Sequence, residues 1–160
     1  FCYDKRLYDR LVENGAKAVT GHLHADGDYQ SKLIRFIENH DEPRAAATFE
    51  PGPARAAAVT TATVGGATLW HEGQFEGRRV RLPVFLGRFP QEPVDDDLRH
   101  FLHRLLRAVD EQCVRDGEWR LLDAHGWPDN QTYTSLLTWA WSGSGGLDGA
   151  CPGPDGAVAE

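Results

Sequence analysis

Methionine is absent from this 160-residue sequence, lysine is scarce, and no long apolar run occurs. Lysine stands only at positions 5, 17 and 32, so arginine supplies most of the positive charge. The 24 acidic residues outnumber the 17 basic ones and give a net charge of −7, which argues against nucleic acid or an anionic membrane as the main partner. No apolar stretch reaches the roughly 20 residues that a membrane-spanning helix needs.

Cysteine is also rare. The three cysteines, Cys2, Cys113 and Cys151, are far apart and form no C-x-x-C pair. This spacing predicts neither a disulfide framework nor a zinc site, so we expect free thiols, no metal and no cofactor. Because Phe1 is not an initiator methionine, we expect the chain to be a fragment or a processed piece. No signal peptide is visible, and the expected localisation is cytoplasmic.

Periodicity in the rest of the chain predicts an α/β fold. Apolar residues at helical spacing predict helices over Tyr3–Asn14 and Leu98–Arg115, and a run of small residues predicts another over Ala54–Val64. Between these helices, apolar runs predict buried strands over Leu33–Glu38 and Ala67–Trp70. Strands that alternate with helices favour a parallel sheet.

The last part of the sequence has a different character. Trp119–Asp123 and Leu136–Trp141 alternate between apolar and polar residues, as strands of a small β domain would. Ser142–Glu160 consists mainly of Gly, Pro and Asp with hardly any large apolar residue. Such a segment cannot bury a core, and we expect it to be disordered.

The segment Arg35–Arg44 (RFIENHDEPR) holds the strongest candidate site. Its apolar strand stops abruptly at Asn39, His40 and Asp41, and a proline follows. A carboxylate and an imidazole at a strand mouth can hold sugar hydroxyls, bind a metal or transfer protons. An ordinary strand-end turn, in which Asn and Asp are common, is an equally good interpretation of these residues alone.

A second polar cluster follows the next predicted strand. His71, Glu72 and Gln74 stand there, without the second histidine of a zinc-protease helix. A loop at the mouth of a barrel and an ordinary strand-end loop explain them equally well. The nearby arginines Arg78, Arg79 and Arg81 are expected to form local salt bridges.

Five segments together resemble the α-amylase family of glycoside hydrolases, in a bacterial branch. Phe36–Arg44 (FIENHDEPR) resembles the fourth short motif of that family, which carries Asn-His-Asp at the end of the seventh barrel strand. Phe1–Leu11 is similar to the segment after the fifth strand, and Trp70–Arg88, with its Gly-Gln pair, to the loop after the eighth. Asp96–Val109 resembles the last barrel helix, and Trp119–Trp141 the approach to the C-terminal β domain.

The resemblance implies a fold and a division of the chain. It implies the C-terminal part of a TIM (β/α)8 barrel over residues 1–116 and the start of a β domain over residues 117–141, with residues 142–160 as a disordered tail. A whole barrel needs about 250 residues, so most of it would lie outside this sequence.

The same resemblance implies roles for individual residues. Asp41 matches the catalytic carboxylate that holds sugar hydroxyls and stabilises the oxocarbenium-like transition state, and His40 matches an imidazole that binds the same sugar. Asn39, Glu72 and Gln74 are the other candidate substrate-binding residues. Glu38 and Arg44 are expected to be structural partners that orient the loop.

The implied activity is hydrolysis or transfer at α-glucosidic bonds of an α-glucan or maltooligosaccharide, by a retaining mechanism. Such a mechanism needs a nucleophile and a general acid about 5 Å apart, which the family takes from its fourth and fifth strands. The resemblance implies that this chain begins after them, so we expect no glycosidase activity from it alone. A non-catalytic glucan-binding or interaction module derived from the same barrel, and a truncated inactive gene product, are the alternatives.

Overall fold

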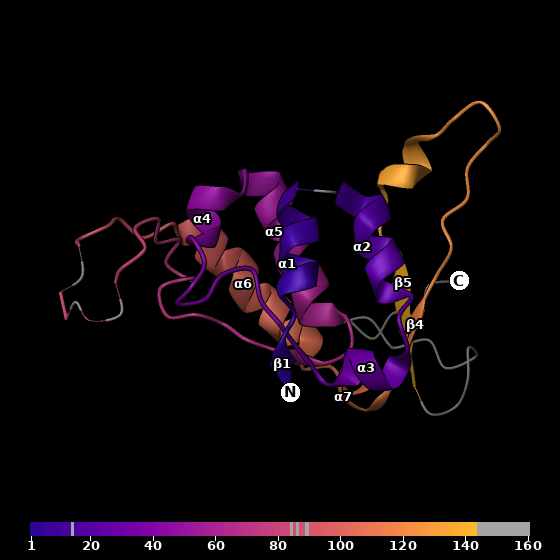
Figure 1. The fold of residues 1–160 in the computed structure, drawn as a ribbon, viewed down its shortest axis with the longest axis horizontal. Helices are drawn as coiled ribbons and strands as arrows, with labels where there is room; N and C mark the ends of the chain where they lie inside the picture. The colour runs from indigo at the N-terminus through magenta and orange to yellow at the C-terminus, as the bar shows by residue number, and fades with distance from the viewer. Residues whose placement is uncertain (14, 84, 86, 89, 144–160) are drawn as a thin grey trace.

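The computed structural model describes residues 1–13, 15–83, 85, 87–88 and 90–143, and within them it forms two separate sheets (Figure 1). The first sheet holds β1 (Cys2–Tyr3), β2 (Leu33–Arg35) and β3 (Ala67–Thr68), all parallel and in that order. The second pairs β4 (Glu118–Leu121) with β5 (Trp139–Ser142) in antiparallel fashion.

Helices connect the parallel strands, which confirms the predicted α/β class with a parallel sheet. The strands are shorter than predicted, and β1 contains Tyr3, at which the sequence predicted the start of a helix. The helices of the described residues are α1 (Lys5–Glu13), α2 (Gly15–Leu23), α3 (Gly27–Ser31), α4 (Ala45–Thr48), α5 (Pro51–Thr63), α6 (Asp96–Val109) and α7 (Gln112–Asp116), with a 3-10 turn at Thr132–Ser135.

One predicted helix is interrupted. The apolar stripe predicted a continuous helix over Leu98–Arg115, but α6 ends at Val109 and Glu111 has an extended backbone (ψ 139°) before α7 begins. At the start of α6 the Asp95 carboxylate caps the helix by accepting the Leu98 N–H at 2.9 Å. The break lets α7 pack against β4 and β5, a tertiary contact that periodicity does not reveal.

Two apolar clusters form the core. One lies between α5 and α6 and includes Ala58, Leu102 and Leu105, and the other includes Leu7 and Val19 of the first two helices. The β4–β5 hairpin covers the second cluster with Trp119, Leu121 and Trp139. Its indole groups also donate hydrogen bonds to residue Thr63 at the end of α5, from Trp139 Nε1 at 3.1 Å and Trp141 Nε1 at 2.6 Å.

A buried polar network joins the amino-terminal helices to the sheet. Asp4 follows β1 directly and is 2% exposed, and its carboxylate pairs with the fully buried guanidinium of Arg35 at the end of β2. The same carboxylate contacts His22 Nε2 at 2.8 Å and caps α1 by accepting the Leu7 N–H at 3.0 Å. Gln30 completes the network, since its side-chain oxygen accepts a hydrogen bond from Arg35.

The structure also bears on the cysteines, on membrane-spanning helices and on the C-terminal tail. The Cys2 thiol is free and exposed, whereas Cys113 is disulfide-bonded, so the expectation of free thiols is wrong at Cys113. Within the described ranges no helix is both long and apolar enough to cross a membrane. The predicted disordered tail begins at Ser142, which belongs to β5, so the prediction is wrong at that residue; from residue 144 onward the tail lies outside the described residues.

Candidate functional site

The candidate site lies at the carboxyl edge of the parallel sheet. After β2, residues Phe36 to Asn39 continue into the interior, and each is at most 4% exposed. The Asn39 side chain then shapes the turn, because its Oδ1 accepts the backbone N–H groups of Asp41 at 2.8 Å and Glu42 at 2.9 Å. This asparagine turn places His40 and Asp41 in solvent, with His40 Nε2 3.2 Å from Asp41 Oδ2.

Behind the turn, Glu38 and Arg44 form the structural pair expected from the sequence. Glu38 is 1% exposed, its Oε2 accepts the Ala45 N–H at 2.6 Å, and its Oε1 lies 3.1 Å from Arg44 Nη2. Arg44 reaches on to the loop after β3, where it donates to the Glu72 carbonyl at 2.7 Å and to His71 Nδ1 at 2.8 Å. Arg44 therefore fastens the loops after β2 and β3 to each other.

Burial sets the charge state of this cluster. Desolvation raises the pKa of Glu38 to about 7, against the opposing hydrogen bond from Ala45 and the charge of Arg44. Desolvation and the Arg44 charge lower the pKa of His71, so its imidazole is neutral at neutral pH. The geometry agrees, because an arginine can only donate, and Nδ1 of His71 must therefore accept.

The loop after β3 depends on a glycine. Gly73 has a φ of +82°, and a Cβ there would lie 2.5 Å from Arg44 Nη2 and 2.6 Å from Arg78 Cδ. Next to it, Gln74 is 3% exposed and its Oε1 accepts the His71 N–H at 3.1 Å. Gly73 and Gln74, the predicted Gly-Gln pair, therefore stabilise the loop after β3 through its backbone conformation and a buried hydrogen bond.

Replacing this glycine is expected to destabilise the protein. Gly73→Ala should lower the free energy of unfolding by about 1–3 kcal/mol, because alanine is strained at positive φ and its methyl group displaces the Arg44 guanidinium. Gly21→Ala is the matched control: this glycine lies inside α2 with open space around it, and alanine there should add about 0.5–1 kcal/mol. Chemical denaturation of both variants measures the difference, and equal effects would contradict the assignment.

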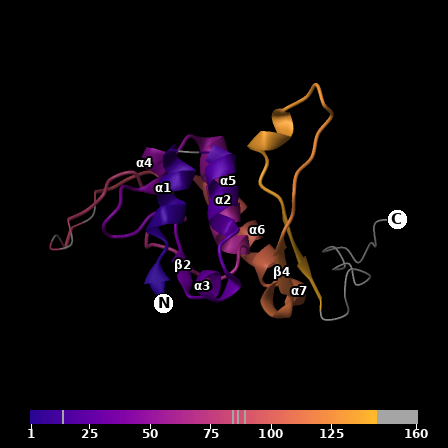
Figure 2. The ribbon, with the colours of Figure 1, turned by 45° about the vertical axis from the view of Figure 1, so that its right-hand side comes forward.

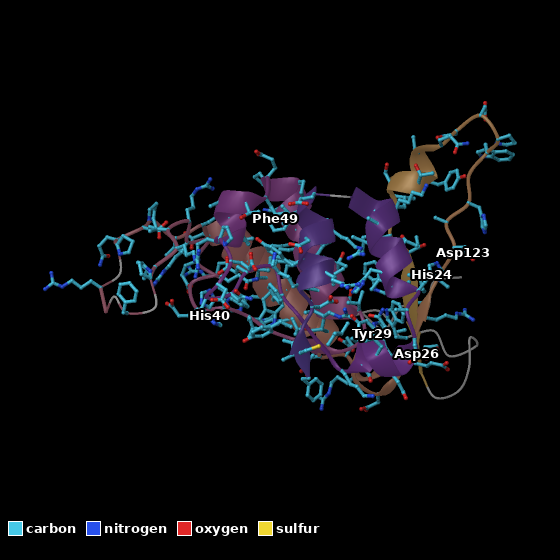
Figure 3. All side chains as sticks on the ribbon, in the orientation of Figure 1. His24, Asp26, Tyr29, His40, Phe49 and Asp123 are labelled. Atoms are coloured by element: carbon cyan, nitrogen blue, oxygen red, sulfur yellow. The ribbon has the colours of Figure 1, made fainter. Side chains whose placement is uncertain are left out.

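A cavity of about 300 Å³ opens beside the turn. Of the predicted site residues, Asn39, His40 and Glu72 line it, together with His71. Asp41 stands next to His40 outside the lining, and Gln74 lies beneath the loop. Figure 3 labels His40 on the side of the molecule from which residues 78–83 and 90–95 project, as the ribbon views also show (Figures 1 and 2).

The cavity also has walls that the motif did not predict. The projecting segment between β3 and α6 supplies most of these wall residues. They are far from Asn39 in the sequence, so the motif around Asn39 could not predict them. Arg78 forms the expected local salt bridge, with its Nη1 3.1 Å from Glu72 Oε1. The full lining is Asn39, His40, Arg44, His71, Glu72, Arg78, Val80, Arg81, Leu82, Pro83, Pro90 and Glu92.

The arrangement suits a small polar ligand. Imidazole, amide, guanidinium and carboxylate groups around one cavity can donate to and accept from hydroxyl groups. In the part of the chain that the structure describes, no group of three His, Cys, Asp or Glu side chains is placed to hold a metal ion.

Comparison with known proteins adds a structural similarity. No protein-family model and no curated protein matches the chain. Among solved structures, the noncanonic maltogenic α-amylase AmyB from Thermotoga neapolitana matches with a TM-score of 0.61 at 20% sequence identity. The match covers 88% of this chain and 35% of that chain, so this sequence spans about a third of that protein's length. At this identity the similarity shows the fold, which is consistent with part of a barrel.

Proposed function

We propose that this chain is part of an α-amylase-type glycoside hydrolase or glucanotransferase that acts on α-glucosidic bonds by a retaining mechanism. The observation that carries the proposal is the Asn39-His40-Asp41 turn at the carboxyl end of a buried parallel strand. In barrel enzymes that edge of the sheet holds the active site. The fold similarity to a maltogenic α-amylase supports the same assignment.

In this proposal Asp41 is the transition-state-stabilising carboxylate. The asparagine turn fixes its backbone, while its side chain is free to accept hydrogen bonds from sugar hydroxyls, which strengthen as the ring distorts toward an oxocarbenium ion. His40 donates to the same sugar, and Glu72 lines the same cavity from the loop after β3. Asn39 contributes through the turn, since its Oδ1 already accepts two backbone N–H groups.

The nucleophile and the general acid are assigned to no residue of this chain. Among its carboxylates, Asp4 follows β1 but is committed to Arg35 and His22, and Glu38 is committed to Ala45 and Arg44. The proposal therefore concerns sugar binding by the 160-residue chain and turnover only by a longer polypeptide. A non-catalytic glucan-binding module would use the same residues for binding.

Sugar binding tests this assignment. We expect the chain to bind maltotriose in isothermal titration calorimetry, and Asp41→Ala to weaken binding by about tenfold or more, because hydrogen bonds to a charged acceptor are lost. Asp110→Ala is the control, since this carboxylate is similarly exposed (77% against 70%) but lies at the end of α6. Maltotriose affinity that is unchanged in Asp41→Ala would overturn the role of Asp41.

A further inference from the structure

We infer that the cavity beside the asparagine turn recognises an anionic group on a small sugar, a phosphate ester or a carboxylate, with Arg81 as the main contact. The sugar part of this inference rests on the proposed function, whereas the anion part rests on the cavity itself. A neutral maltooligosaccharide has no anionic group that the arginines of this cavity could bind.

The lining carries three guanidinium groups and two carboxylates, and a third carboxylate, that of the buried Glu38, lies behind it 3.1 Å from Arg44 Nη2. Arg44 and Arg78 therefore each have a carboxylate partner, which leaves Arg81 as the lining arginine that has none among the described residues. Within the concave, partly apolar surface of a cavity, such a guanidinium attracts anions more strongly than on an open surface. The charged lining residues are Arg44, Arg78, Arg81, Glu72 and Glu92.

Both carboxylates of the lining, those of Glu72 and Glu92, already have partners. Glu72 Oε1 lies 3.1 Å from Arg78 Nη1. Glu92 is held by the backbone of the same projecting segment, because its Oε2 accepts the Arg79 N–H at 2.7 Å. Neither carboxylate is therefore held against the guanidinium of Arg81.

Arg81 uses few of its N–H donors within the described residues. Among the described residues it forms no ion pair, and its side chain makes one hydrogen bond, a long one of 3.4 Å from Nη2 to the His40 carbonyl. A guanidinium carries five N–H donors in a planar fork that matches a phosphate or carboxylate in bidentate fashion. Arg44 differs, since it pairs with the Glu38 carboxylate and donates to His71 Nδ1 and to the carbonyls of Glu72 and Arg78.

The other walls indicate the size and class of the ligand. A cavity of about 300 Å³ is at the small end of ligand pockets, which favours a monosaccharide or disaccharide over a long glucan. Val80, Leu82, Pro83 and Pro90 supply apolar surface on which a sugar ring can rest. His40 and Asn39 lie at the end of the cavity where hydroxyl groups would meet the asparagine turn.

Calorimetric titration of the full chain tests the inference with four probes: glucose 1-phosphate, glucuronate, glucose and inorganic phosphate. We expect at least one of the two sugar anions to bind about tenfold more tightly than glucose and than inorganic phosphate. Whichever of the two binds more tightly identifies the anionic group as a phosphate ester or a carboxylate. Arg81→Gln should weaken that binding by about tenfold, because the bidentate contact is lost.

Arg79→Gln is the matched control, since Arg79 carries the same charge two residues away but does not line the cavity. Its affinity for the sugar anion should stay close to that of the wild type. Sugar anions that bind no better than glucose, inorganic phosphate that binds as tightly as the sugar anion, or equal losses in both variants would each overturn the inference. Maltotriose binding that depends on Asp41 would leave the proposed function intact in any of these cases.

Discussion

Asp4→Ala is expected to lower the free energy of unfolding by about 3–5 kcal/mol, the largest effect of any single substitution considered for this chain. The reason is the guanidinium of Arg35, which is fully buried and pairs with the Asp4 carboxylate. Burial lowers the pKa of Arg35 to about 10, so the group remains charged at neutral pH. Without Asp4, that charge is left in the interior with no anion beside it. Urea denaturation at neutral pH measures the loss.

Two further variants show whether the buried charge is the cause. Asp9→Ala removes a carboxylate that pairs with the exposed Lys5, and it should change stability by less than about 1 kcal/mol. Adding Arg35→Met to Asp4→Ala removes the unpaired charge and should recover part of the stability. If the double variant were no more stable than Asp4→Ala, the loss would come from the α1 cap or from packing instead.

Glu38→Gln is expected to change how stability depends on pH. The folded-state pKa of Glu38 is about 7, above the ordinary 4.5, so the native state holds a proton between these values that the unfolded state has released. The contribution of Glu38 to stability is therefore fully present below about pH 4.5 and is lost as the pH rises to about 7. The shift corresponds to roughly 3 kcal/mol.

The measurement compares unfolding free energies of both proteins from pH 4 to pH 8. Glutamine keeps the acceptor for the Ala45 N–H but does not titrate, so the variant should gain stability relative to the wild type as the pH rises through this window. The His71 contribution, whose lowered pKa acts in the opposite sense below about pH 6.5, is present in both proteins and cancels to first order. Glu13→Gln, at an exposed carboxylate, should leave the wild-type profile unchanged; parallel profiles for Glu38→Gln would contradict a shifted Glu38.

Local signals in the sequence predicted α1, α5 and α6 among the helices of the described residues. The apolar stripe of α6 and its aspartate cap act within a few residues of the chain, so periodicity and capping chemistry suffice to place the helix start. The break before α7 depends on packing against β4 and β5, which no local pattern encodes. Strand β1 escaped prediction because two residues cannot show an alternation.

The same distinction holds at the candidate site. The Asn39 turn joins groups two and three residues apart, and the residue types alone made a strand-end turn a good prediction. The pairing of Glu38 with Arg44 was also expected, since only six positions separate them. The contacts of Arg44 with the loop after β3 cross 27 and 28 positions, and the walls around Arg81 come from a segment still further along the chain.

The sequence by itself therefore determined the alternation of strands and helices and the Asn39-His40-Asp41 cluster at the end of a strand. All of these depend on interactions within one or two turns of the chain. Only the tertiary structure decided which charges are buried together, because Asp4 meets Arg35 through the pairing of β1 with β2. It likewise decided that Asp41 stays in solvent while Glu38 is desolvated, since burial depends on every segment that packs around a group.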